Sequence, residues 1–241
     1  MDKVMNALED ENKHLIGIYG MGGVGKTTLM EEIGRRLQKD KKFDAVIKVV
    51  VSQNPNIEQI GRGIAEELGM PLEGSGESAA WALATRLRKE KKILIMLDDV
   101  WARLELKTVV GIPYGEDHKG CKILITTRKA RVCGTMECDT AVPVDVSSDE
   151  DSWVLFNSKA GEVIEDPDLE PLSREVVKEC AGLPLAIVVV GRAPRGRGKK
   201  SSWEGALLQL KRVIPKNLEG VEDQLFKVPR TELQLYERRG D

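Results

Sequence analysis

The chain has 241 residues, of which 41% are hydrophobic and 32% charged, a composition that supports one large or two small packed domains. Lys and Arg number 37 and Asp and Glu number 39, giving a formal net charge of −2. Because a dedicated nucleic-acid-binding domain should be clearly basic, no specific nucleic-acid partner is expected. No apolar run is long enough for a transmembrane segment, and residues 1–11 lack the apolar stretch of a signal peptide. A cytoplasmic chain is therefore expected, with the nucleus as a second compartment.

The cysteines are most simply free thiols, as expected in a reducing compartment. A zinc site is the alternative, because His118 lies near three of them in the sequence. Zinc sites, however, usually pair cysteines as C-x₂₋₄-C, and no such pair occurs here. The four cysteines are Cys121, Cys133, Cys138 and Cys180.

Residues 1–14 predict a short polar helix, and the apolar run 15–19 has the length of a buried strand. The following segment matches the pattern G-x-x-x-x-G-K-[ST] and leads into residues with helical spacing. Strand, glycine-rich loop and helix in this order predict a phosphate-binding loop, rather than a turn that merely starts a helix. The residues predicted to bind the nucleotide here are Gly20, Met21, Gly22, Gly23, Val24, Gly25, Lys26, Thr27 and Thr28.

Two side chains of this loop carry specific predicted roles. Lys26 is a candidate catalytic residue because its ammonium would reach the β- and γ-phosphates. The Thr27 hydroxyl would bind Mg²⁺.

Four further apolar runs predict strands, and stretches of helical periodicity separate them. The runs are continuous rather than alternating, which indicates a parallel sheet covered by helices on both faces. Residues 1–145 are therefore predicted to form an α/β P-loop domain with a five-stranded parallel sheet. Pro143 suits an edge strand. The predicted strands after 15–19 are 45–51, 93–97, 122–126 and 141–144.

Polar residues follow the predicted strands at the sheet edge where ligands of such folds bind. Asp98 would hold Mg²⁺ directly or through a water. Asp99 is the candidate for orienting or deprotonating an attacking water, with capping or ion pairing as an equal alternative. Arg128 suits a γ-phosphate, or a carboxylate elsewhere on this edge.

From about residue 147 the pattern is helical only, and Pro184 stands where a helix should begin. Residues 146–215 are predicted to form a small all-helical domain that ends with a helix at 203–210. The basic segment 192–200 is better explained as a solvated loop than as a phosphate or nucleic-acid patch. Residues 216–241 are interpreted as the truncated start of a winged-helix-like region or a disordered tail.

Several blocks together resemble the NB-ARC region of plant disease-resistance proteins with leucine-rich repeats, of the coiled-coil type, which are P-loop STAND NTPases. The phosphate loop alone is typical of a superfamily, whereas the last block is far more specific. The blocks are Gly20–Thr28, Phe43–Ile47 with Val51–Gln53, Leu97–Trp101, Cys121–Arg128 and Gly182–Ala186, with a weaker one at Trp153–Phe156.

The resemblance implies an ADP/ATP switch with slow Mg²⁺-dependent hydrolysis, in which ADP holds a closed resting state and ATP permits opening and assembly. It implies that Pro184, with Leu185 beside it, binds the adenine and that Arg128 senses the γ-phosphate. Other domains or protomers of resistance proteins are the implied partners.

The chain also departs from the family pattern. It has no Met-His-Asp triplet, no leucine-rich repeats and no N-terminal signalling domain, and Lys48 stands where the family commonly has Trp. These departures favour an alternative function, a non-enzymatic truncated fragment that associates with full-length relatives.

Overall fold

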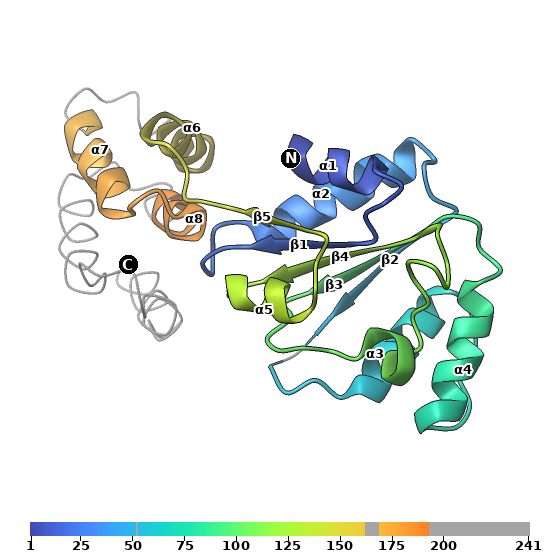
Figure 1. Ribbon diagram of the computed structural model, residues 1–241. Helices are drawn as coiled ribbons and strands as arrows, with labels where there is room; N and C mark the ends of the chain where they lie inside the picture. The colour runs from blue at the N-terminus through green and yellow to red at the C-terminus, as the bar shows by residue number, and fades with distance from the viewer. Residues whose placement is uncertain (52, 162–168, 193–241) are drawn as a thin grey trace. The chain divides into compact units, whose positions relative to one another are not determined.

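A computed structural model describes residues 1–51, 53–161 and 169–192 of the chain (Figure 1). The chain divides into two compact units. The first comprises Met1–Met21 and Gly25–Val144, and the second comprises Gly22–Val24 together with Asp145–Asp241. Among the described helices, none combines the length and apolar character that a membrane span requires.

The first unit is built on a five-stranded sheet with the order β2-β3-β4-β1-β5. All of its strand pairs are parallel, which confirms the predicted α/β fold class. β5 lies at an edge, where Pro143 costs no ladder hydrogen bond, as predicted. The strands are β1 (Leu15–Tyr19), β2 (Ala45–Val50), β3 (Ile93–Asp98), β4 (Cys121–Thr127) and β5 (Thr140–Pro143).

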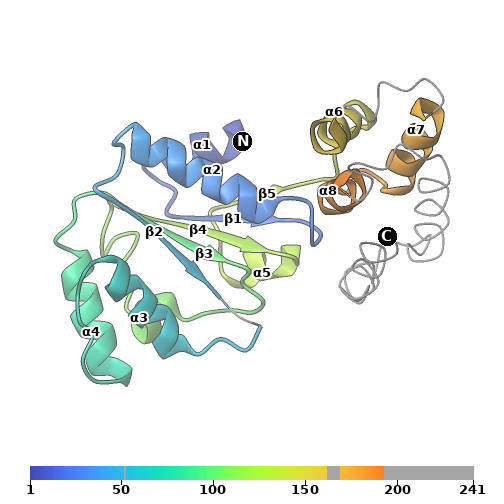
Figure 2. The same cartoon turned by 180° about the vertical axis from the view of Figure 1, so that it is seen from behind.

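Both faces of this sheet are buried, because helices cover each of them (Figures 1 and 2). In β3, Ile95 packs in the cluster on one face and its neighbour Met96 in the cluster on the other. This two-sided burial explains the continuous apolar runs in the sequence. On one face lie α1 (Asp2–Glu9) and α2 (Lys26–Lys39), and on the other α3 (Ile57–Glu67), α4 (Gly76–Leu87) and α5 (Ala130–Thr135).

Two short elements of this unit were not predicted: α5 and the π-helical turn η1 (Leu106–Val110). Each has too few residues to show a periodic apolar face in the sequence. Their buried side chains nevertheless complete the core, since Leu106, Val110 and Val132 all belong to the cluster that packs under α3 and α4.

Gly111 ends η1 with a φ of +89°, and a Cβ added there would lie 2.2 Å from the Ala80 carbonyl oxygen. Gly111→Ala should therefore lower the free energy of unfolding by about 3 kcal/mol, from left-handed strain plus a backbone clash. Gly69→Ala is the control, because Gly69 has a φ of +63° and open space around it. It should cost only about 1–2 kcal/mol in urea unfolding. Equal losses in the two variants would contradict the role of the close contact with Ala80.

The described part of the second unit contains helices where the sequence predicts them, α6 (Asp149–Ala160), α7 (Glu170–Glu179) and α8 (Pro184–Arg192). The Ser148 hydroxyl caps α6 by accepting a hydrogen bond from the Asp151 N–H at 3.1 Å. Trp153 stacks on the fully buried Phe156 with ring centroids 5.6 Å apart. The predicted helix at 203–210, the basic segment from 193 onward and the tail 216–241 lie outside the described residues.

All four cysteines are free thiols. Burial raises the pKa of Cys121 to about 12 and that of Cys180 to about 12, so both stay protonated near neutral pH. Within the described ranges, no group of three or more His, Cys, Asp or Glu side chains is arranged to hold a metal.

Candidate functional site

The glycine-rich loop lies between β1 and α2, at the carboxyl edge of the sheet. The Gly20 N–H donates to the Thr127 carbonyl at 3.2 Å, which ties the start of the loop to the end of β4. Gly25 precedes α2 with a φ of +95°, a conformation that side chains disfavour. It offers no side-chain cap, and the first turn of α2 has no acidic residue. The N–H groups at the start of α2 could therefore bind an anion.

Lys26, the first residue of α2, folds back over this loop. Its Nζ donates to the carbonyl oxygens of Gly20 and Met21, both at 2.7 Å, and the residue is only 8% exposed. Burying an ammonium is costly unless it is well bonded, so phosphate oxygens entering the loop would find a cation already held there.

Asp98 ends β3 and is 4% exposed. Its Oδ1 accepts hydrogen bonds from the hydroxyls of Thr27 at 2.9 Å and Thr126 at 2.6 Å. Its Oδ2 lies 3.7 Å from Nζ of Lys48. A buried carboxylate beside a threonine hydroxyl is the oxygen donor set that suits Mg²⁺. The structure thus brings together Thr27 and Asp98, the two residues predicted as metal ligands.

Two of these neighbours, Thr126 and Lys48, are not predicted from the sequence to belong to the site. The sequence predicts Thr126 only as part of a strand, and Lys48 differs from the residue that is common in the family. Lys48 did leave a signal, since it is the only charged residue within β2. When both faces of a sheet are buried, a charged side chain in one of its strands needs a partner of opposite charge. The carboxylates at the carboxyl ends of the strands are candidates for that partner.

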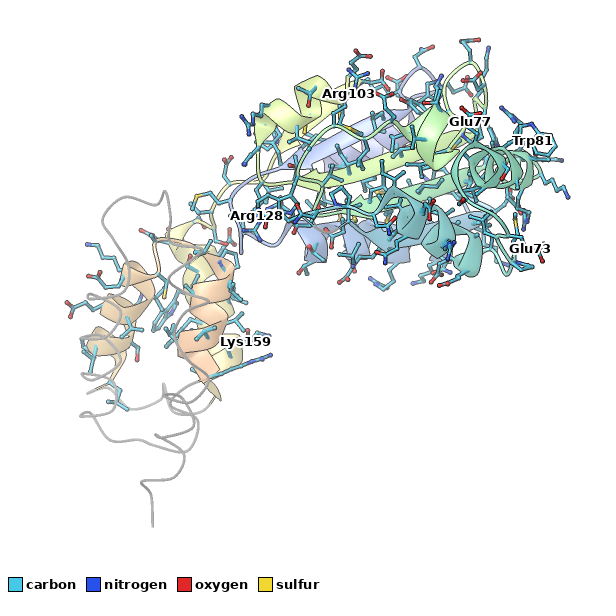
Figure 3. All side chains as sticks on the ribbon, turned by 90° about the horizontal axis from the view of Figure 1, so that it is seen from below. Glu73, Glu77, Trp81, Arg103, Arg128 and Lys159 are labelled. Carbon is cyan, nitrogen blue, oxygen red and sulfur yellow. The ribbon has the colours of Figure 1, made fainter. Side chains whose placement is uncertain are left out.

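Asp99 and Arg128 lie together at the same edge, and Figure 3 labels Arg128 there. Nε of Arg128 is 3.5 Å from Oδ1 of Asp99, and the guanidinium lies 4.8 Å from the ring centroid of Trp101. The Trp101 indole N–H donates to Oδ2 of Asp99 at 3.0 Å. Both carboxylate oxygens of Asp99 therefore have partners, which is the ion-pairing arrangement that was left open for Asp99 and Arg128.

The backbone at Asp99 is held in an unusual conformation. Its φ is +59°, which is uncommon for a residue other than glycine, and its N–H donates to the Thr126 hydroxyl at 2.9 Å. Thr126 thus contacts both aspartates. Strained residues of this kind cluster at functional sites.

Pro184 and Leu185 open α8 in the second unit. The loop residues Gly22–Val24 group with this unit, and the Leu185 N–H donates to the Gly23 carbonyl at 3.2 Å. Pro at the first helical position has no N–H to leave unsatisfied, which explains why α8 begins there.

A cavity of about 770 Å³ lies elsewhere, at the edge where the parallel strands begin. His14, Asp44, Lys92 and Gly120 line it, each close before the start of a strand. No predicted site residue lines this cavity. Since ligands of open parallel sheets bind at the carboxyl ends of the strands, the glycine-rich loop rather than the cavity is the candidate functional site.

Comparison with known proteins shows the family of this chain. The family model described as "NB-ARC domain" matches residues 1–165. Disease resistance protein At4g27190 of Arabidopsis thaliana is 37% identical over 93% of this chain and 23% of its own length. Disease resistance protein RPS5 of the same plant is 37% identical over 95% of this chain and 26% of its own length. The chain thus spans about a quarter of the length of these relatives.

Solved structures with similar folds are more distant in sequence. The ORC2 protein of Aeropyrum pernix, in ADPNP–ADP complexes, has a TM-score of 0.63 and 18% identity, over 89% of this chain and 67% of that one. A RuvB variant of Thermotoga maritima has a TM-score of 0.54 and 12% identity, over 98% of this chain and 75% of that one. At these identities the likeness concerns the fold alone.

Proposed function

Because the chain belongs to the NB-ARC family, the nucleotide-binding module of plant disease-resistance proteins, we propose that it is an ADP/ATP switch with slow Mg²⁺-dependent hydrolysis. The observation that carries this proposal is the convergence of Lys26, Thr27 and Asp98 at one sheet edge. A buried ammonium, a hydroxyl and a buried carboxylate lie side by side there, beside a helix N-terminus of the kind that can bind an anion.

Each residue has a role in this proposal. The backbone of Gly20–Thr28 and the Lys26 ammonium bind the phosphates. Thr27 and Asp98 hold Mg²⁺, which when bound neutralises charge on the phosphates. Pro184 and Leu185 contribute contacts to the adenine from the second unit.

Slow turnover is consistent with the surroundings of Asp99. A general base needs a carboxylate oxygen that can reach the attacking water. Both oxygens of Asp99 already have partners, Arg128 and the Trp101 indole. We propose that Arg128 leaves Asp99 for the γ-phosphate when ATP is bound, which releases Asp99 toward the water. ADP has no γ-phosphate, so the ion pair persists. The two nucleotides thereby favour different states of the same edge.

The family supports a proposal about the partners and the compartment. We propose that other domains or protomers of resistance proteins are the partners, in the cytoplasm or the nucleus, as part of plant defence. The non-enzymatic interaction fragment remains the competing function, and phosphate release from the wild type compared with Lys26→Ala separates the two.

The central test is calorimetric titration of the purified chain with ATP and with ADP in the presence of magnesium, together with identification of any nucleotide that co-purifies. Micromolar or tighter binding of either nucleotide supports the switch. A folded sample without affinity for either nucleotide would falsify it.

Arg128→Ala should discriminate between the two nucleotides. We expect the affinity for ATP to fall about tenfold, because one charge-assisted contact is lost, and the affinity for ADP to change little. Arg86→Ala is a matched control, since Arg86 on α4 pairs with Glu90 at 2.6 Å and takes no part in the site. Equal losses for ATP and ADP in Arg128→Ala would rule out a γ-phosphate contact.

A further inference from the structure

Lys48 places a fixed positive charge beside the carboxylate that is proposed to hold Mg²⁺. Its Nζ lies 3.7 Å from Oδ2 of Asp98, and the same ammonium pairs with Glu31 of α2. The lysine side chain is 26% exposed and that of Asp98 is 6% exposed, so water screens this charge only partly.

The two oxygens of Asp98 have different neighbours. Oδ1 accepts hydrogen bonds from the hydroxyls of Thr27 and Thr126, whereas Oδ2 faces the Lys48 ammonium. A cation that binds next to the Thr27 hydroxyl must share Asp98 with this ammonium. Like charges so close to one carboxylate repel each other strongly where screening is weak.

The same contact has a second consequence. A buried carboxylate without a cation is costly, and Lys48 supplies that cation when no magnesium is present. The Asp98 carboxylate can therefore stay charged beside bound phosphates even when no Mg²⁺ is bound.

We propose that Lys48 is an internal counter-ion of the nucleotide site, which makes nucleotide binding by this chain largely independent of Mg²⁺. Lys48 is a positioning and specificity residue in this scheme, not a catalytic one. It acts through Asp98. Glu31 on α2 weakens this effect because it pairs with the same ammonium. This inference rests on the proposed nucleotide site and specifies how that site treats its metal.

The test measures the dissociation constants of ADP and ATP in EDTA and in saturating magnesium. For each nucleotide, the dissociation constant in EDTA divided by that in saturating magnesium is called the magnesium coupling. We expect a coupling within about threefold for the wild type and an increase of about tenfold or more in Lys48→Met, because the competing charge is gone. Lys48→Arg keeps the charge and should keep the wild-type coupling.

Two further variants complete the design. Lys42→Met removes a lysine that pairs with Glu9 at the opposite edge of the sheet, and should leave the coupling unchanged. Glu31→Gln frees Lys48 to turn fully toward Asp98 and should lower the coupling below the wild-type value. Glu31 has a side chain that is 56% exposed, so this variant should fold even if Lys48→Met does not.

The outcomes are distinct. Raised coupling in Lys48→Met with unchanged coupling in Lys48→Arg and Lys42→Met supports the counter-ion role, as does lowered coupling in Glu31→Gln. Wild-type coupling in both Lys48→Met and Glu31→Gln overturns this inference alone. Absence of nucleotide binding by the wild type in either condition overturns the inference together with the proposed function.

Discussion

Replacing Lys26 with alanine should lower the affinity for ATP and for ADP about a hundredfold. The Lys26 ammonium is nearly buried and is held by the carbonyls of Gly20 and Met21, at the point where phosphates would enter. Removal of a buried cation from a charged hydrogen-bonded contact typically costs about 2–5 kcal/mol of binding, and about 1.4 kcal/mol corresponds to a tenfold change. Calorimetric titration measures the loss directly.

The chain offers a close control for this experiment. Lys122 is 7% exposed, and its Nζ also donates to two backbone carbonyls, those of Asp10 and Lys13. It lines the cavity at the other edge of the sheet. Lys122→Ala removes the same kind of interaction without touching the candidate site. It should lower stability and leave nucleotide affinity unchanged.

Thermal unfolding gives an independent readout. A nucleotide that binds only the folded state raises the unfolding temperature by an amount that grows with the logarithm of its concentration relative to its dissociation constant. At an ADP concentration below the dissociation constant of Lys26→Ala, ADP should therefore stabilise the wild type and Lys122→Ala but hardly stabilise Lys26→Ala. Equal stabilisation of Lys26→Ala and the wild type would argue that the phosphates bind elsewhere.

Replacing Asp98 with alanine should have the second large effect, on stability as well as on metal dependence. The substitution leaves the hydroxyls of Thr27 and Thr126 without their acceptor and leaves the Lys48 ammonium without one of its two carboxylates. Breaking such a buried, charged network typically costs about 3–5 kcal/mol of folding free energy. Urea unfolding of the nucleotide-free chain tests this value.

Asp98→Asn separates the two consequences. The amide oxygen still accepts from the two threonine hydroxyls, so most of the stability should remain, at a cost of about 1–2 kcal/mol. The charge that attracts Mg²⁺ is lost, so the proposed Mg²⁺-dependent hydrolysis should fall about tenfold or more in both variants. A variant at Asp98 that hydrolyses ATP with the magnesium dependence of the wild type would contradict the assignment of this carboxylate to the metal.

The geometry of the glycine-rich loop could be predicted because its chemistry is local. Gly25, Lys26 and Thr27 are consecutive, so their types and their spacing already determine a left-handed turn, a helix start and a cation beside it. The parallel sheet could be predicted for a related reason. Burial on both faces gives β3 a continuous apolar run from Ile93 to Leu97 and β4 a shorter one from Ile123 to Ile125, and these runs are visible in the linear sequence.

Contacts between segments that are far apart in the sequence are harder to predict from the sequence. The sequence leaves two roles open for Asp99, water activation or ion pairing, and two partners open for Arg128, a phosphate or a carboxylate. The structure shows the two as an ion pair, with Trp101 against both. The residues belong to loops after different strands, and only the folded sheet brings these loops side by side.

The sequence by itself determined the glycine-rich loop between a strand and a helix, the parallel α/β class and the helices α6 to α8, because each depends on residue types at short spacing. Only the tertiary structure decided that Lys48 and Thr126 meet Asp98. The three strands that carry these residues are far apart in the sequence but adjacent in the sheet. The desolvation of the buried Asp98 carboxylate is therefore offset by partners that no local sequence pattern could identify.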